Sequence, residues 1–324
     1  MYYLKLPQIG TQKLSFYLAT EEYAARYLEP DPIFFYWQVE PSVIIGRNQN
    51  IDKEVNLDYC REQGINVFRR KSGGGCVYAD KSNVMLAYIA KGEDVQLTYS
   101  NYTTLVVSAL KRMGFNVQAT GRNDIVVDGG KVSGSAFYHL PGRNIVHGTL
   151  LYDTNMRNMV ASITPSNEKL VAKGVESVRS RINLLKDYTT LTLDEIKDNL
   201  RTMLCCDTIS LGDDDLERIR EIEKSYVSES FIYGKSKAWN HVRRSRIENC
   251  GDVEVRLRIV QGKIEAAELA GDYFLLRDTD EELSKAMLGA ELEESSLLSC
   301  FEKFPPEQCV RGLKTKDLIR LILS

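Results

Sequence analysis

Three consecutive glycines follow a run of cations in the first quarter of the chain. The segment reads Arg69, Arg70, Lys71, Ser72, Gly73, Gly74, Gly75, Cys76, Val77, Tyr78. Adjacent glycines cost conformational entropy on folding, so they are expected where the main chain must approach a ligand closely. Their N–H groups can form a concave anion site, and the preceding cations favour a phosphate or a carboxylate. The alternative is a flexible hairpin loop whose charges are solvated.

A second group of polar side chains surrounds a lysine. Asn123 and Asp124 precede an Asp-Gly turn, and Lys131 then begins a run of small residues, Ser133–Ala136. A lysine that points inward over such a small-residue floor can hold a carboxylate and a phosphate together and offset the charge that builds up as they react. Asn123 and Asp124 offer oxygen ligands of the kind that Mg²⁺ prefers. The alternatives are a solvated lysine and a carboxylate at a strand edge.

One of only three histidines, His147, lies in the apolar run Asn144–Leu151. A single histidine in an apolar strand is more often a hydrogen-bonded core residue than a catalytic base, and we favour the core interpretation.

Two common nucleotide-binding patterns do not fit the sequence. Ile125 stands six positions before Lys131, where a P-loop needs glycine, and Tyr78 stands where a dinucleotide fingerprint needs its third glycine. A nucleotide site would therefore use another architecture.

Composition excludes several classes of protein. The 324 residues contain 42 Lys+Arg and 45 Asp+Glu, a net charge of −3, which argues against a general nucleic-acid binder. Seven cysteines without a Cys-x-x-Cys pair fit neither a disulfide framework nor a zinc ribbon. The sequence shows no signal peptide and no apolar segment near the roughly 20 residues that span a bilayer. We expect a cytoplasmic protein without a membrane or nucleic-acid partner.

Periodicity and turn residues predict the elements that position these groups. Helices are expected at 11–28, 54–63, 100–113, 192–204 and 213–226, and strands at 33–37, 43–46, 66–69, 84–90, 124–127, 131–133 and 144–152. Close hairpins exclude a purely parallel sheet, so we expect an α/β protein with a mixed, α+β sheet. A C-terminal unit is predicted with strands at 252–260, 263–269 and near 273–276, and helices at 279–288 and 314–323. We place the large domain at 1–245 and a small α+β domain at 246–324, with the polar stretch 233–246 at the boundary.

Taken together, the motifs resemble those of the lipoate–protein ligase A family. The matching segments, in chain order, are Ser42–Asn50, Arg69–Tyr78, Gly121–Ile125, Lys131–Ala136, His147–Leu151 and Ser177–Arg181. The C-terminal part, with Tyr233–Ser236 and Gly271–Phe274, is similar to the family's accessory domain. One departure is Ala79, which stands where family members often have histidine.

The resemblance implies a biotin/lipoate ligase-like catalytic domain and a two-step reaction. Lipoate and ATP with Mg²⁺ give lipoyl-AMP, and a lysine ε-amine of a carrier then takes the lipoyl group. The implied partners are the lipoyl domains of 2-oxoacid dehydrogenase E2 subunits or the glycine cleavage H protein, and a monomer is expected.

The resemblance also implies roles for individual residues. Lys131 is the implied catalytic residue and contacts both substrates, and Asp124 is the implied Mg²⁺ ligand. Nucleotide contacts fall on Arg70, Ser72, Gly73, Gly74, Gly75, Cys76, Val77, Tyr78, Asn123, Asp124, Lys131, Lys169 and Lys173. Lipoate contacts fall on Trp37, Val77, Lys131, Ser133, Gly134, His147 and Gly148. The loop 164–174, which carries Lys169 and Lys173, is expected to fold over the adenylate.

Three other functions remain open at this point. An octanoyl or lipoyl transferase would act without ATP through a reactive thiolate, for which Cys76 is the candidate near the site. A biotin–protein ligase shares the chemistry but not the sequence motifs. A lipoate-binding or carrier-docking protein without catalysis would bind the ligand and show no pyrophosphate exchange.

Overall fold

The computed structural model describes residues 1–7, 10–120, 123–163, 181–233, 239–277 and 279–324. The chain forms two compact units. The first comprises Met1–Ile45, Ile51–Arg70 and Cys76–Ile232, and the second comprises Gly46–Asn50, Lys71–Gly75 and Tyr233–Ser324. Within the described ranges, no helix is both long and apolar enough to cross a membrane.

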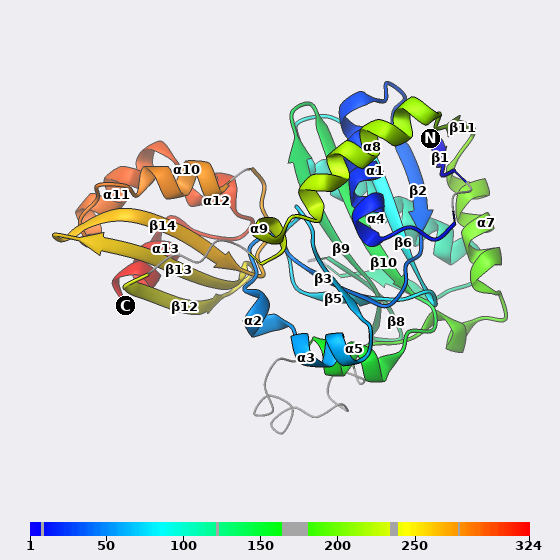
Figure 1. The fold of residues 1–324 in the computed structure, drawn as a ribbon, viewed down its shortest axis with the longest axis horizontal. Helices are drawn as coiled ribbons and strands as arrows, with labels where there is room; N and C mark the ends of the chain where they lie inside the picture. Colours follow the sequence, from blue (N-terminus) through cyan, green and yellow to red (C-terminus); the bar gives the residue numbers. More distant parts are fainter. Residues whose placement is uncertain (8–9, 121–122, 164–180, 234–238, 278) are drawn as a thin grey trace. The chain divides into compact units, whose positions relative to one another are not determined.

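The first unit is built on a mixed sheet of eight strands (Figure 1). In chain order its elements are β1 (Tyr2–Lys5), α1 (Leu14–Tyr27), β2 (Ile33–Trp37), β3 (Ser42–Ile45), α2 (Ile51–Glu54), α3 (Leu57–Glu62), β4 (Asn66–Arg69), β5 (Val77–Ala79), β6 (Asn83–Lys91), α4 (Val95–Arg112), β7 (Val117–Ala119), β8 (Asp124–Val127), β9 (Gly130–Leu140), β10 (Arg143–Leu151), α5 (Met156–Ser162), a 3-10 helix (Leu185–Tyr188), α7 (Leu193–Leu204), β11 (Asp207–Ser210), α8 (Asp213–Tyr226) and α9 (Glu229–Ile232).

The large sheet has the strand order β11-β1-β2-β6-β10-β9-β8-β7. Strand β1 is parallel to β11 and β2, and every other pair in this sheet is antiparallel. The prediction of a mixed α/β sheet is therefore confirmed. A second sheet, β4-β3-β5, is smaller. The predicted helix 54–63 is the shorter α3, which begins only at Leu57 because Asn56 caps it by accepting a hydrogen bond from the Tyr59 N–H.

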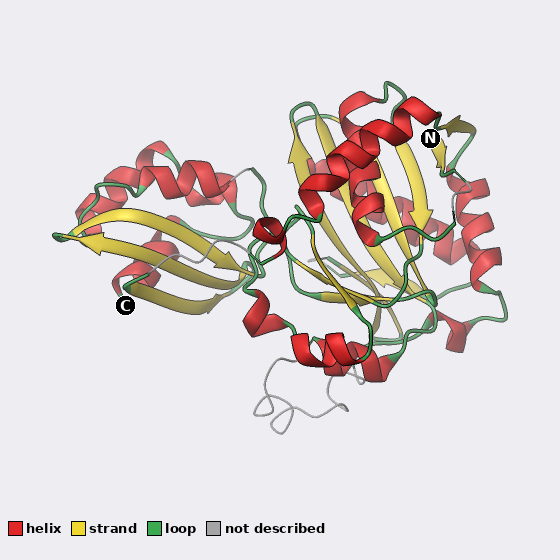
Figure 2. Cartoon of the chain, in the orientation of Figure 1, coloured by secondary structure: helices red, strands yellow, loops and turns green. Residues whose placement is uncertain are grey.

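Helices cover both faces of the large sheet (Figure 2). Helix α1 packs on β6 and β10, while α4 packs on β9 and β10. His147 and Gly148, neighbours on β10, identify the two faces: His147 bonds Glu21 of α1, and a side chain at 148 would point at Tyr102 of α4. Strand β10 is buried along its whole length, and its polar side chains Asn144 and His147 have hydrogen-bond partners inside the unit.

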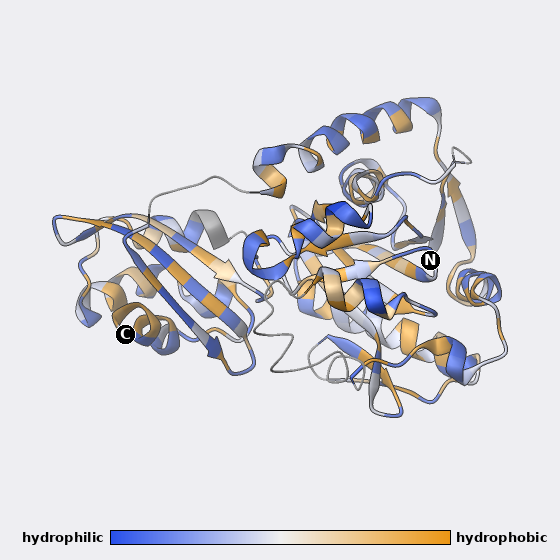
Figure 3. Cartoon of the chain, turned by 60° about the horizontal axis from the view of Figure 1, so that its bottom comes forward, coloured by the Kyte–Doolittle hydropathy of each residue, from blue (hydrophilic) through white to orange (hydrophobic). Residues whose placement is uncertain are grey.

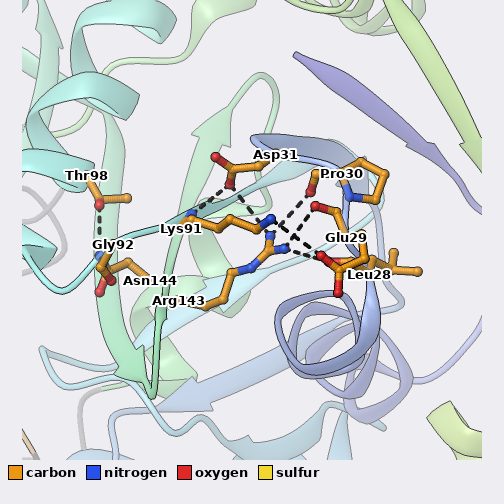
Figure 4. Close-up of polar contacts among 9 residues, drawn as sticks. All are labelled: Leu28, Glu29, Pro30, Asp31, Lys91, Gly92, Thr98, Arg143 and Asn144. Carbon is orange, nitrogen blue, oxygen red and sulfur yellow. Dashed lines mark hydrogen bonds and ion pairs between the residues drawn. The ribbon is translucent and has the colours of Figure 1, made fainter.

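A polar network surrounds the buried Arg143, the first residue of β10 (Figure 4). The Arg143 guanidinium donates to three successive main-chain carbonyls, those of Leu28, Glu29 and Pro30, and lies 3.6 Å from the Asp31 carboxylate. These carbonyls follow the C-terminal end of α1, where a cation is favoured. Arg143 therefore fixes the end of the helix that carries Glu21.

The second unit contains the three-stranded antiparallel sheet β12 (His241–Ile247), β13 (Gly251–Val260) and β14 (Lys263–Gly271), with β13 in the centre. Its helices are α10 (Thr279–Ala286), α11 (Glu294–Lys303), α12 (Pro306–Cys309) and α13 (Thr315–Leu323). Hydrophilic and hydrophobic residues alternate along the strands (Figure 3). One face of the sheet therefore packs on an apolar core that includes Val255, Leu257 and Leu318.

The predicted third strand of this unit was wrong. The segment 273–276 forms no ladder with the sheet and makes only an isolated bridge between Leu275 and Val310. The third strand is β12, inside the stretch that was read as a polar boundary. Its first four side chains alternate between partly buried and exposed positions and the next two are exposed, so this edge strand with a solvent face looks polar in sequence. The apolar character of 273–276 instead reflects burial of Tyr273, Phe274 and Leu275.

Candidate functional site

Lys131 reaches the α1 face of the large sheet through an irregularity in β9. Asp128 and Gly129 have positive φ values of 46° and 80°, which make the tight turn between β8 and β9. The register of β8 against β9 then shifts by one residue, which leaves Val132 as an extra residue on β9. Without it, Lys131 and Gly134 would point to opposite faces, because side chains alternate along a strand. A bulge of this kind re-aims the side chain beside it.

The Lys131 ammonium lies across the main chain of Gly134. Its Nζ is 2.8 Å from Oδ1 of Asp124, and each of the two side chains is about one-third exposed. A Cβ at position 134 would lie 2.6 Å from this Nζ and 2.7 Å from Cε. Only glycine leaves room for this arrangement. The Lys131 ammonium therefore lies over the small residues of β9, beside Asp124, the carboxylate that the resemblance assigned to Mg²⁺.

Five strands contribute to one row of residues through this point. Asp124 of β8 pairs with Gly134 of β9, and Gly134 with Thr149 of β10. Thr149 pairs with Met85 of β6, and Met85 with Trp37 of β2. Strands lie about 4.8 Å apart, so Trp37 and Gly134 are separated by about 14 Å across the sheet. The row thus begins at a charged pair and ends at a buried aromatic ring.

The next row on the same face has small residues around His147. Ala87 and Ala136 pair with His147 from either side. His147 is 5% exposed, and its Nδ1 is 2.7 Å from Oε2 of the fully buried Glu21. His147 is thus a hydrogen-bonded core residue, as the apolar strand indicated. The assignment of His147 to lipoate binding stays a prediction.

Like His147, Trp37 contacts helix α1. Its ring stacks on that of Tyr17, with centroids 5.0 Å apart and planes within 3°. Val77 of β5 packs against the apolar cluster that contains Trp37. These two candidates for a lipoyl contact therefore belong to one apolar region of the first unit.

The structure does not bring all the predicted lipoate residues together. Ser133 pairs with Leu150, which lies two residues from Gly148 on β10. Residues two apart on a strand point to the same face, so the side chains of Ser133 and Leu150 face α4 rather than α1. A Cβ at position 148 would lie 2.5 Å from the Tyr102 hydroxyl, so that glycine is explained by helix packing. Sequence reasoning missed Thr149 and Met85, which only strand pairing places beside Gly134 and Trp37.

Asn123 has a structural partner in the same hairpin. Its Nδ2 donates to the Ser135 carbonyl at 3.2 Å, and its main-chain carbonyl accepts from the Ser135 N–H at 2.9 Å. The amide therefore closes the ladder between β8 and β9 next to Asp124. Among the described residues, no group of three His, Cys, Asp or Glu side chains has a metal-binding arrangement.

Two of the three cations before the glycines, Arg69 and Arg70, are buried rather than solvated, and the nucleotide contact of Arg70 stays a prediction. Arg70 donates from Nη1 to the Ile44 carbonyl at 3.0 Å, and Arg69 donates from Nε to the Ile232 carbonyl at 2.9 Å. Burial lowers the pKa of Arg70 to about 10, with Cys76 opposing the shift and Arg69 adding to it. Arg70 is therefore held in place by the end of β3 while it remains a cation at neutral pH.

The glycine run has a second structural reason within the second unit. A Cβ on Gly73 would lie 2.3 Å from the Tyr273 carbonyl oxygen, and the Gly74 N–H donates to that oxygen at 2.9 Å. Gly74 also has a positive φ of 85°, whereas a Cβ on Gly75 would meet nothing within 4 Å. Ser72 is buried, and its carbonyl accepts from the Arg47 N–H. Main chain of the same unit therefore approaches Gly73 and Gly74 closely, and the predicted approach of a ligand stays a prediction.

The residues after the glycines divide between two sides of β5. Val77 and Ala79 belong to the apolar cluster with Trp37, whereas Tyr78 packs in a different cluster with Val43. Burial raises the pKa of Tyr78 to about 12. Burial also raises the pKa of the Cys76 thiol well above its ordinary value, outweighing the opposite effect of Arg70.

Several predicted site residues lie outside the described residues. They are Gly121 and Arg122 of the third motif, the loop 164–174 with Lys169 and Lys173, positions 177–180 of the last motif, and 234–236.

Comparison with known proteins places the chain in a family. Residues 13–204 match the profile of the lipoyl protein ligase A/B catalytic domain, and residues 236–322 match that of the bacterial lipoate protein ligase C-terminus. Lipoate-protein ligase LplJ of Bacillus subtilis is 32% identical over 317 residues, covering 94% of this chain and 95% of LplJ. Lipoate–protein ligase 1 of Staphylococcus aureus is 30% identical over 314 residues, covering 94% and 95%.

Solved structures share the fold. The crystal structure of P. falciparum LipL1 in complex with lipoate has a TM-score of 0.82 at 20% identity, covering 100% of this chain and 99% of LipL1. That of lipoate-protein ligase A bound with ATP has a TM-score of 0.63 at 23% identity, covering 72% and 98%. The predicted fold, a lipoate ligase-like catalytic domain followed by a C-terminal domain, is confirmed by these matches. The catalytic-domain profile matches more than half of the chain, and two named relatives are at least 30% identical to it over 94% of its length. The chain therefore belongs to the lipoyl protein ligase A/B family.

Proposed function

We propose that the chain is an ATP-dependent lipoate–protein ligase that forms lipoyl-AMP and transfers the lipoyl group to a lysine of a carrier domain. Support comes from the named relatives at about 30% identity and from one geometric observation. The Lys131 ammonium lies over Gly134 beside Asp124, in a row of residues that ends at Trp37. A fatty-acid-like ligand needs both a cation for its carboxylate and an apolar surface for its chain.

In the first step, a lipoate carboxylate oxygen attacks the α-phosphorus of ATP, and pyrophosphate leaves. Two anions must approach each other, so a fixed ammonium lowers the barrier by offsetting their repulsion. We assign this role to Lys131, with Arg70 as a second cation near the nucleotide. Ser72, Gly73–Gly75 and Cys76–Tyr78 remain the proposed main-chain contacts of the nucleotide, together with Asn123.

In the second step, the neutral ε-amine of a carrier lysine attacks the carbonyl carbon of the mixed anhydride. The amide forms, AMP leaves with the bonding electron pair, and the amine loses a proton to solvent. The proposed carriers are E2 lipoyl domains or the glycine cleavage H protein. In support, a structure titled as a bi-partite lipoate protein ligase and its E2 lipoyl domain from Thermoplasma acidophilum has a TM-score of 0.66 to this chain.

Mg²⁺ fits the donors present. It binds through one or two carboxylates together with substrate phosphates, so Asp124 with ATP would suffice. The ion would neutralise phosphate charge when bound. Asp124 is the residue that would hold the ion.

Lipoate-dependent exchange of labelled pyrophosphate into ATP tests the first step. We expect exchange with the wild-type chain and a loss of about 10²–10³-fold with Lys131→Ala, the effect of removing one preorganised charge-stabilising group. Exchange that survives Lys131→Ala would reject the role of this lysine. Absence of exchange in the wild-type chain, with lipoate still bound, would favour a binding protein.

Transfer to an apo lipoyl domain, followed by mass spectrometry, tests the second step. ATP-independent transfer from an acylated carrier would favour the transferase. That function needs a reactive thiolate, and the raised pKa of Cys76 argues against it.

A further inference from the structure

The main chain of Lys131 is bonded by a segment distant in sequence. Its N–H donates to the Arg181 carbonyl at 2.8 Å, and its carbonyl accepts from the Asn183 N–H at 2.9 Å. Lys131 and Ile182 thereby form an isolated parallel bridge. This segment begins where the predicted ligase motif Ser177–Arg181 ends. The proposed catalytic lysine therefore depends on 181–183 for both of its peptide hydrogen bonds.

The Asn183 side chain extends this contact around the turn between β8 and β9. Its Nδ2 donates to the Val127 carbonyl at 2.8 Å and to the Tyr188 hydroxyl at 2.8 Å. Val127 is the last residue before the turn, and Lys131 is the second residue of β9 after it. Asn183 thus holds both ends of the hairpin, one through its side chain and the other through its main chain.

Gly130 shows how closely this side chain is fitted. A Cβ at position 130 would lie 2.2–2.5 Å from the amide atoms of Asn183. The φ of Gly130 is not in the left-handed region, so the glycine is explained by the approach of Asn183 rather than by backbone strain. The turn and the asparagine are therefore matched in shape.

We propose that Asn183 is a positioning residue for Lys131. Lys131 lies between the turn and the bulge at Val132, and its ammonium must reach across Gly134 to lie beside Asp124. Strand β10 pairs with β9 only from Ser133 onward, so at Lys131 the bonds from 181–183 take the place of that ladder and fix the direction in which Lys131 leaves the main chain. The inference rests on the proposed function for its catalytic consequence, but the positioning itself is a property of the free protein.

Asn183→Ala removes the side-chain bonds without adding bulk, and Asn183→Asp keeps the shape but turns an acceptor toward the Val127 carbonyl. We expect both to lower kcat/KM for lipoate-dependent pyrophosphate exchange at least tenfold. In a Lys131→Ala background, Asn183→Ala should have no further effect on exchange, because a positioning residue acts only through the lysine that it positions. Asn240→Ala is the matched control, since it removes an amide bond to the Ile259 carbonyl of 2.7 Å in the other unit. It should leave exchange within twofold.

A second readout does not depend on ligase activity. Competitive acetylation of the ligand-free protein with an N-hydroxysuccinimide ester, read by mass spectrometry, gives the relative reactivity of each lysine. We expect Lys131 in Asn183→Ala to be acetylated at least threefold faster relative to the other lysines, because it is released from Asp124. Unchanged exchange and labelling with only a lower melting temperature would overturn the proposal. If the wild-type chain shows no exchange, the proposed function fails, and the labelling result still decides the positioning role.

Discussion

Lys131 and Asp124 form an ion pair of 2.8 Å directly above a glycine, although the lysine and that glycine are three residues apart on one strand. The extra residue Val132 makes this geometry possible, because it turns Lys131 onto the face that carries Gly134. The row from Asp124 to Trp37 then combines charge at one end with an apolar ring at the other. This relationship is the basis of the proposed adenylation site.

Gly134→Ala tests whether the ammonium must lie across the strand. The new Cβ would stand 2.6 Å from Nζ, so the end of the lysine side chain must move away from its present position. Because that end is flexible, we expect the free energy of unfolding to change by less than about 1 kcal/mol, while pyrophosphate exchange falls at least tenfold. Gly212→Ala is the control, since its Cβ would be 3.7 Å from the nearest atom. Normal exchange in Gly134→Ala would contradict the arrangement.

Cys76 should be a poor nucleophile. Its raised pKa means that, at any pH below that value, a smaller fraction is thiolate than for an ordinary cysteine. We expect iodoacetamide at pH 8 to modify the exposed Cys206 well before Cys76, and the rate at Cys76 to keep rising with pH beyond 9. Cys76→Ala should leave exchange within a few-fold. Rapid labelling of Cys76 at neutral pH, or near-complete loss of activity on its substitution, would support the transferase instead.

Ala79→His replaces the residue that departs from the family pattern. Ala79 is 1% exposed within the apolar cluster that contains Trp37 and Phe68, so the larger polar ring would overpack a filled region. We expect a loss of about 1–3 kcal/mol in the free energy of unfolding, measured by denaturant titration. Adenylation below the melting transition should stay within a few-fold of wild type. A gain of orders of magnitude would show that alanine impairs the reaction.

Arg143→Met tests the network that anchors α1. The variant leaves the carbonyls of Leu28 and Pro30 without their donor, which should lower the free energy of unfolding by about 1–3 kcal/mol. Arg143→Lys keeps a positive charge but gathers its donors on one nitrogen, whereas the arginine reaches the carbonyls from both Nη1 and Nη2, so we expect an intermediate loss. Arg143 and Thr149 are six residues apart on β10, or about 20 Å. KM values for lipoate and ATP should therefore not change, and a large KM change with normal stability would be the contradictory result.

Much of the fold could be predicted because local patterns determine it. The turn at Asp128–Gly129 needs positive φ, the helix 213–226 has an apolar periodicity, and β10 is rich in apolar residues because it is buried on both faces. Strand β12 could not be found in this way. An edge strand with one solvent face is largely polar, and only its pairing with β13 distinguishes it from a linker.

The sequence alone determined which residue types were available: a lysine beside small residues, a nearby carboxylate, a glycine run and aromatic side chains. Those choices, and the order of the motifs, indicated the family. Tertiary structure decided which of them face one another. Strand alternation separates Ser133 and Gly148 from Lys131, register brings Trp37 and Thr149 into its row, and burial turns Arg69 and Arg70 toward main-chain carbonyls. These outcomes depend on pairing between distant segments, which no local pattern of residues encodes.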